Sequence, residues 1–227
     1  MVGAIARRVG QRYCAHLTAL ALCAGGLGHL APRWLAARPD PATVFFDSDL
    51  LQIDAVLAKK SPELGISLRR RVADAVLDEA RRARFDPLFV LALIEVESSF
   101  DGEAVSWAGA RGLMQLTPVT LVWLAGIEGL RLSSEELWRD PALQVRLGVR
   151  YLSRLEKRFG SLDLALMAYN AGPERLRLAM GEGDVERFKP YVGAVRRDFA
   201  RFRRGVVLQD SAALARAGGP SLGRPLP

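Results

Sequence analysis

Hydrophobic residues along the chain recur mainly at helical spacing, and strand-like alternation of apolar and polar residues is almost absent. The longest amphipathic segment is 141–159, where Leu147, Tyr151 and Leu155 fall at four-residue steps with basic residues between them. No internal repeat and no coiled-coil heptad is visible. The pattern therefore predicts an all-α fold.

Capping residues predict where several of these helices begin. Ser67 is the expected N-cap of a helix over residues 68–83, and Asp86 with Pro87 starts a short apolar helix that ends near Ser98. The other expected helices begin at Thr117-Pro118 and at a Ser133/Glu136 capping box, or span residues 141–159, 162–171 and about 188–202.

The last expected helix carries an apolar stripe on one face and arginines on the other. We interpret the arginines as a solvated face rather than a dedicated binding patch. The stripe consists of Phe188, Tyr191, Val192, Val195, Phe199 and Phe202.

The N-terminal segment is typical of an export signal. Its first 31 residues contain Arg7, Arg8 and Arg12 and no acidic residue, and an apolar run follows over residues 17–30. Glycines and histidines make this run a poor membrane span, although an uncleaved anchor is the alternative. We therefore assign residues 1–37 to an export signal or N-terminal anchor.

Both cysteines of the chain, Cys14 and Cys23, fall inside this leader. The mature chain would then contain no internal disulfide, and its stability would depend on its hydrophobic core. Lipid attachment at Cys23 is a further alternative, which the bulky Leu22 immediately before it disfavours.

Length and composition favour one main domain. The chain has 227 residues, half of them hydrophobic, and no glycine- or proline-rich linker near its middle. We expect an N-terminal extension over residues 38–66, a catalytic domain over 67–204 and a flexible tail over 205–227. Without the first 31 residues, 29 basic residues face 25 acidic ones, a net charge of +4 that suits an anionic polymer and is too small to indicate nucleic acid.

Most familiar chemistries are excluded by the residues that are missing. Both histidines, His16 and His29, lie in the leader, so no histidine remains for a zinc site or for activating a serine or cysteine nucleophile. No glycine loop that could cradle a phosphate follows a strand. We therefore expect neither a metal nor a cofactor, and carboxylate chemistry remains.

Glu97 is the carboxylate that stands out. It follows Val90, Leu93 and Ile94 at helical spacing and so projects along their apolar face, whereas Glu95 points elsewhere and is the better candidate for a solvated charge. A buried carboxyl group is disfavoured as an anion, so its pKa should be high, as a general acid requires. The alternative is a structural glutamate paired with an arginine.

Three further polar residues are open to two interpretations. Tyr169 and Asn170 end an apolar helix, and Gln115 lies where a loop enters a helix. Such residues are often only caps. Alternatively, Tyr169 orients a carboxyl group while Asn170 and Gln115 bind a sugar.

Taken together, several separated segments resemble the soluble type of lytic transglycosylase, which has a goose-lysozyme-like catalytic domain. The resemblance covers residues from about 68 to about 204. The matching segments are Glu97-Ser98-Ser99-Phe100, Ala104-Val105-Ser106, Gly109 to Pro118, Asp140-Pro141, Gly148 to Leu152 and Ala168 to Pro173.

This resemblance implies a lysozyme-like helical domain in which Glu97 is both acid and base. Tyr169 would hydrogen-bond the carboxyl group of Glu97. The implied sugar-binding residues are Ser106, Met114, Gln115, Thr117 and Asn170. The family cleaves the β-1,4 bond between N-acetylmuramic acid and N-acetylglucosamine in peptidoglycan, and the muramoyl C6 hydroxyl closes a 1,6-anhydro ring without consuming water.

The chain departs from the usual family pattern at a few positions: Asp101-Gly102, Thr117 and Gln144. Because Thr117 affects a subsite wall, the family's glycan preference carries over to this chain less safely than the family's reaction does. A hydrolytic muramidase and a non-catalytic wall-binding module of an envelope-spanning assembly are the competing hypotheses. The expected partner is the glycan strand in the periplasm or cell envelope, with membrane attachment through the N-terminus and secretion or envelope-assembly partners left open.

Overall fold

The computed structural model describes the backbone of residues 41–216 and the side chains of residues 48–205. Within this range no strand occurs, and the β-bridges of Arg111 with Val105 and Leu116 are isolated. The elements are α1 (Pro41–Lys60), η2 (Pro62–Leu64), α2 (Gly65–Ala83), α3 (Pro87–Ser98), α4 (Pro118–Ile127), α5 (Ser134–Trp138), α6 (Pro141–Phe159), α7 (Leu162–Ala171), α8 (Pro173–Glu182), η3 (Glu186–Phe188) and α9 (Lys189–Arg216). The all-α prediction is confirmed. The export signal or anchor predicted over residues 1–37 lies outside the described residues.

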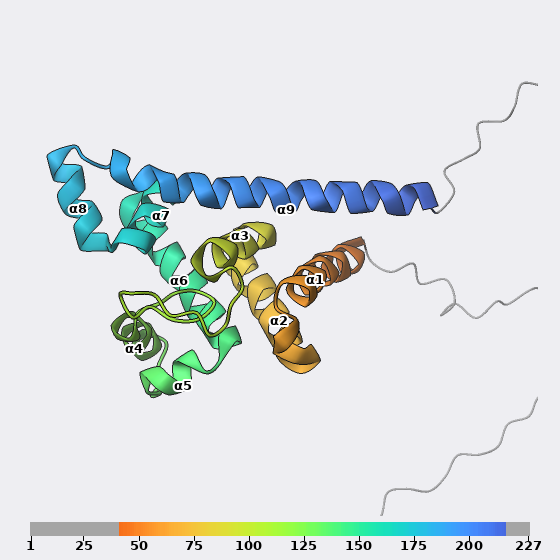
Figure 1. The fold of residues 1–227 in the computed structure, drawn as a ribbon, viewed down its shortest axis with the longest axis horizontal. Coiled ribbons are helices and arrows are strands. Elements are labelled where there is room, and N and C mark those ends of the chain that lie inside the picture. Colours follow the sequence, from red (N-terminus) through yellow and green to blue (C-terminus); the bar gives the residue numbers. More distant parts are fainter. Residues whose placement is uncertain (1–40, 217–227) are drawn as a thin grey trace, which may run out of the picture. The chain divides into compact units, whose positions relative to one another are not determined.

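Helix α3 is the central element of the core. It contacts α1, α2 and α9, and α9 passes along it in Figure 1. Every residue from Phe89 to Ile94 is buried. Helix α6 packs against α2 on one side and α7 on another. The partly exposed side chains of residues 95–98, at the end of α3, therefore project from a helix whose middle is fixed in the core.

Local capping chemistry explains the predicted helix ends. The Asp86 side chain accepts a hydrogen bond from the backbone N–H of Leu88, and the Asp140 side chain accepts from the first turn of α6. Gly160 ends α6 in the left-handed conformation, with φ of 73°. The capping box of Ser133 and Glu136 is formed as predicted. The predicted spans 141–159 and 162–171 are confirmed.

The helices differ from the expectation in three respects. Helix α2 begins at Gly65, directly after η2, so Ser67 lies inside its first turn and is not the N-cap. Helices α1 and α8 were not predicted, and the separation of apolar and polar residues in α1 is weak. Helix α9 continues to Arg216, beyond the end near residue 202 that its apolar stripe predicted.

The loop between α3 and α4, residues 99–117, is held against α6 by close packing. A Cβ atom on Gly112 would lie 2.2 Å from Oε1 of the buried Gln144, and one on Gly148 would lie 2.5 Å from Cε of Met114. Both positions thus require glycine, and Gly112 also has a φ of 69°. Loop and helix are consequently fixed relative to each other.

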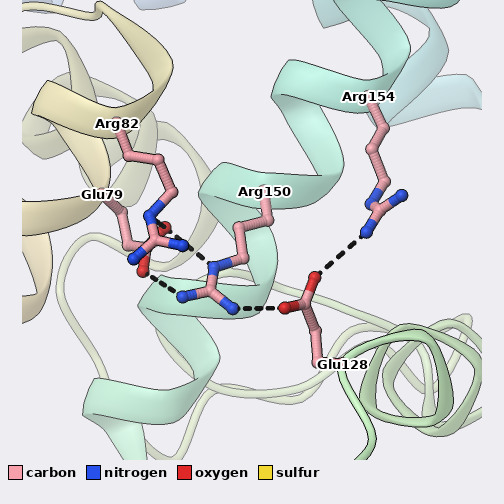
Figure 2. Close-up of polar contacts among 5 residues, drawn as sticks. All are labelled: Glu79, Arg82, Glu128, Arg150 and Arg154. Atoms are coloured by element: carbon pink, nitrogen blue, oxygen red, sulfur yellow. Dashed lines mark hydrogen bonds and ion pairs between the residues drawn. The ribbon is translucent and has the colours of Figure 1, made fainter.

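A network of ion pairs joins α2, α6 and the end of α4, as Figure 2 shows. The carboxylate of Glu79, whose side chain is 2% exposed, receives two hydrogen bonds from Arg150, at 2.8 Å and 2.6 Å. Arg150 also donates to Glu128, which in turn accepts from Arg154 at 3.0 Å. Because Glu79 is buried, its negative charge is stabilised mainly by the ion pair with Arg150.

We predict that Arg150→Met lowers the free energy of unfolding by about 3 kcal/mol, because it leaves a buried carboxylate with only the more distant Arg82. Urea denaturation measures this loss. The matched control is Arg139→Met, which removes an exposed pair with Glu135 and should change stability by less than about 0.5 kcal/mol. Equal losses in both variants would contradict the special role of the Glu79 pair.

Candidate active site

The side chain of Glu97 lies at the end of α3, where that helix packs against α9. The hydroxyl of Tyr191, in the first turn of α9, donates a hydrogen bond to Glu97 Oε1. Burial raises the pKa of Glu97 to about 7, and the hydrogen bond from Tyr191 opposes part of this rise. The high pKa predicted from the apolar periodicity of α3 is confirmed.

Glu95, the other acidic residue of α3, is not the solvated charge that the sequence suggested. Its side chain is only 12% exposed, and its Oε1 pairs with Lys60 and Arg201, each at 2.8 Å. Its Oε2 is buried without a hydrogen-bond partner. The correction arises because α1, which carries Lys60, was not predicted, and it covers this side of α3. Glu95 thus fastens α1 and α9 to the core.

Tyr169 does not make the contact that the resemblance implied. Its hydroxyl donates to the backbone carbonyl of Met114 at 2.8 Å, and Tyr191 takes the expected place at the carboxyl group. Burial raises the pKa of both tyrosines well above the ordinary range, and the charge of Glu97 raises both further. Both hydroxyl groups therefore keep their protons and act as donors near Glu97.

Tyr191 was assigned only to the apolar stripe of the last helix, so its role at the site was missed. A usable signal was present in that stripe. Tyr191 is the one hydroxyl-bearing side chain among phenylalanines and valines, and a buried tyrosine hydroxyl needs a hydrogen-bond partner. Where such a stripe packs against a carboxyl group, one hydrogen bond gives a partner to both the tyrosine hydroxyl and the carboxyl group.

A cleft of about 730 Å³ lies beside Tyr169. Tyr169 lines it and connects it to Glu97, which is not itself among the lining residues. The predicted sugar-binding residues that the structure brings together in its wall are Ser106, Gln115, Thr117 and Asn170.

Met114 is the predicted substrate residue that the structure does not place in the cleft. Its side chain is fully buried against Gly148, so it cannot touch a ligand. Its contribution is its backbone carbonyl, which holds the Tyr169 hydroxyl, while the preceding carbonyl of Leu113 accepts from Ser98 at 3.1 Å. Two hydroxyl groups thus fix the loop that forms the cleft wall.

The polar groups in the cleft differ in what they can offer a ligand. The side-chain nitrogen of Gln115 donates to the carbonyls of Ala104 and Gly112, both at 3.1 Å, so its oxygen remains as an acceptor. The Ser106 hydroxyl accepts from the backbone of Ala110 and keeps its own proton to donate. Asn170 is exposed at the end of α7. Such a mixture of donors and acceptors suits the hydroxyl and amide groups of an amino sugar.

Comparison with known proteins identifies the family of this chain. The transglycosylase SLT domain matches residues 74–190, more than half of the chain. The chain belongs to the SLT transglycosylase family. The matched range includes Glu97 and Tyr169 and ends one residue before Tyr191.

Curated relatives carry lytic transglycosylase names. The SLT chain is 31% identical over 134 residues to the membrane-bound lytic murein transglycosylase C of Mannheimia succiniciproducens, an alignment that covers 57% of this chain and 34% of that protein. It is 34% identical over 97 residues to the soluble lytic murein transglycosylase of Escherichia coli K12, covering 41% of this chain and 15% of that protein. The SLT chain therefore spans about a third or less of the length of these relatives.

Solved structures show the same fold. The chain superposes on the lytic transglycosylase Slt of Pseudomonas aeruginosa with a TM-score of 0.52 and 26% identity, over 73% of this chain and 30% of that one. That structure is of an inactive mutant in which a glutamate is replaced by glutamine. The 70-kDa soluble lytic transglycosylase of Escherichia coli gives a TM-score of 0.53 at 23% identity, with the same coverage. The lysozyme-like fold of the SLT domain is confirmed.

The buried state of Glu97 has a consequence for stability that pH can reveal. The folded chain holds this proton up to about pH 7, whereas an unshifted glutamate releases it near 4.5. Between these values the folded state binds more protons, so stability falls as the pH rises through this window, by about 3 kcal/mol in total.

We predict that Glu97→Gln removes this loss, since glutamine has no charge to bury and its oxygen still accepts from Tyr191. The variant should gain on the wild type in unfolding free energy between pH 4 and pH 8, measured by urea denaturation at both values. Glu103→Gln, in the exposed loop, is the control and should follow the wild type. A Glu97→Gln variant that gained nothing at pH 8 would show that the carboxyl group is not buried as described.

Proposed function

We propose that this chain is a peptidoglycan lytic transglycosylase that cleaves the β-1,4 bond between N-acetylmuramic acid and N-acetylglucosamine and leaves 1,6-anhydro ends. The observation that carries this proposal is the desolvated carboxyl group of Glu97, whose pKa burial raises to about 7, next to a polar cleft. Membership of the SLT family and the names of its relatives support the substrate class.

In the proposed reaction, the protonated Glu97 donates its proton to the glycosidic oxygen as the bond from that oxygen to the muramoyl C1 breaks. The resulting carboxylate then accepts the proton of the muramoyl C6 hydroxyl as its oxygen bonds to C1. The carboxyl group ends in its starting form, and no water is consumed. A pKa near 7 suits both steps, because it leaves the proton transferable in either direction near neutral pH.

One carboxylate is enough for this reaction because the nucleophile belongs to the substrate. A hydrolase normally needs a second carboxylate to activate water or to attack carbon. The residues that line the cleft, all within the described part of the chain, include no aspartate or glutamate. A tethered C6 hydroxyl has no need of one, because it is already held near the reacting carbon.

The neighbouring groups have separate proposed roles. Tyr191 orients the carboxyl group and, by donating to its charged form, keeps its pKa from rising further. Tyr169 positions the cleft wall through Met114. We assign sugar contacts to Ser106, Gln115, Thr117 and Asn170, which line the cleft, and a supporting role to Met114.

The proposed place of action is the cell envelope, where peptidoglycan lies. A curated relative is named membrane-bound and another soluble. Among the described residues, no helix has the length and apolar character required to cross a bilayer. Delivery would depend on the predicted signal or anchor over residues 1–37, and a partner in secretion or envelope assembly would direct the activity locally.

We predict that the wild-type chain releases muropeptides with anhydro ends from purified sacculi and that Glu97→Gln releases none while still binding them. Mass spectrometry of the products provides the measurement, because an anhydro end is lighter by one water than a reducing end. The Glu103→Gln control should retain full activity. Reducing ends would instead indicate a muramidase, and sacculus binding without any products from the wild type would indicate a wall-binding module.

We predict that Tyr191→Phe moves the alkaline limb of the pH profile of kcat/KM, which should lie near pH 7 in the wild type, to higher pH. The shift follows because the lost hydrogen bond had lowered the pKa of Glu97. Tyr169→Phe is the matched comparison. It removes a bond to a backbone carbonyl, should lower stability by about 1 kcal/mol, and should move the limb less. A larger shift with Tyr169→Phe than with Tyr191→Phe would contradict the roles assigned to the two residues.

A further inference from the structure

The cleft has an uneven charge that the proposed acid and base chemistry does not use. Its lining includes two arginines, Arg175 and Arg187, and none of the lining residues is acidic. Arg175 lies in the first turn of α8, and Arg187 lies in η3, so separate elements bring the two side chains to the same cleft.

A single aromatic ring holds both guanidinium groups. The central carbon of Arg187 lies 4.9 Å from the ring centroid of Phe188, and that of Arg175 lies 5.9 Å from it. Phe188 is buried and also lines the cleft. The ring attracts each cation through its π face and so concentrates two positive charges at one place on the cleft wall.

Nearby groups compensate this charge only in part. Arg187 forms an exposed ion pair with Asp184 at 2.9 Å through one nitrogen, which leaves most of its donors unused. For Arg175 no ion pair occurs within the described part of the chain. The N-terminus of α8, at Gly172 and Pro173, also opens on the cleft and has no side-chain cap. Its partial positive charge adds to that of the arginines.

We propose that Arg175 and Arg187 bind a carboxylate on the muramoyl side of the substrate and thereby select strands that carry one. This proposal rests on the proposed function. The amino-sugar backbone is neutral, so its hydroxyl and amide groups can accept hydrogen bonds but offer the two arginines no opposite charge. A carboxylate is supplied either by the stem peptide or, where the stem has been removed, by the lactyl group of muramic acid. Arginine binds such a group through paired, charge-assisted hydrogen bonds.

This interaction would act on binding and positioning rather than on proton transfer. The arginines reach the cleft from α8 and η3, whereas the proton chemistry is assigned to Glu97 at the junction of α3 and α9. Recognition of a carboxylate beside the reacting sugar would fix the register of the strand in the cleft. Exposed charges are screened by salt, so the preference should weaken as ionic strength rises.

The test measures binding by the full chain carrying Glu97→Gln, which should not consume its ligand. Three soluble disaccharide ligands are compared: one with its stem peptide, the same ligand after carbodiimide coupling has converted its carboxylates to amides, and one whose stem an amidase has removed to free the lactyl carboxylate. Arg175→Gln and Arg187→Gln are added singly and together. The control is Arg177→Gln, which lies on the same helix, pairs with Glu174 and is not part of the cleft.

We expect the double variant to lose about tenfold in affinity for a carboxylate-bearing ligand and less than about twofold for the amidated ligand. Arg177→Gln should lose nothing. Loss confined to the stem-bearing ligand would assign the carboxylate to the peptide, and loss confined to the amidase-treated ligand would assign it to the lactyl group. Equal losses for amidated and unmodified ligands, or no loss for any, would overturn the proposal.

The proposed function is tested separately by the products of the otherwise wild-type chain. Binding that depends on the arginines, in a chain that releases no anhydro ends, would refute the reaction and leave the carboxylate site standing. Anhydro products, together with binding that does not depend on the arginines, would support the reaction and refute the carboxylate site.

Discussion

The desolvation of one carboxyl group is the constraint on which the site depends. Glu97 lies in the last turn of a helix whose residues 89–94 are all buried, and a tyrosine of α9 donates a hydrogen bond to one of its oxygens. A charge in this position is costly, so the group keeps its proton to about pH 7. The same burial that makes Glu97 a useful acid makes it a source of instability above neutral pH. Stability elsewhere in the domain must offset that loss.

The rest of the fold holds the surroundings of this group in place. Glycines at positions 112 and 148 let the loop after α3 lie directly on α6, and hydroxyl groups from α3 and α7 hold two successive carbonyls of that loop. Away from the cleft, Arg150 ties α2 to α6 through the buried Glu79. These contacts fix the cleft wall relative to the end of α3. This rigidity matters because proton transfer requires donor and acceptor to be held within hydrogen-bonding distance of each other.

The parts of the structure that follow local rules could be predicted from the sequence. Helix α6 starts at Asp140-Pro141 and ends at Gly160, and α7 ends before Gly172, because capping and backbone freedom decide those boundaries within a few residues. The inward direction of Glu97 followed from the helical period alone. Four of the five residues assigned to sugar contacts line the cleft, although their contact with a sugar stays a prediction.

The errors concern contacts between distant segments. The pairing of Glu95 with Lys60 depends on α1, whose residues do not show a clear amphipathic pattern. Tyr191 rather than Tyr169 contacts Glu97 because of where α9 packs against α3, which no local pattern specifies. Met114 occurs in a motif associated with the cleft, yet its side chain packs in the core, where Gly148 leaves room for it. Each case is decided by tertiary packing rather than by local propensity.

The account is tested most directly by titrating the Glu97 carboxyl group itself. Carbon NMR of a chain labelled at its glutamate side chains, with the Glu97→Gln spectrum used for assignment, would follow its protonation from pH 3 to pH 9. A midpoint of about 7 is expected. A midpoint near 4.5 would mean that the group is solvated and ionised at neutral pH, and it would remove the general acid on which the proposed reaction depends.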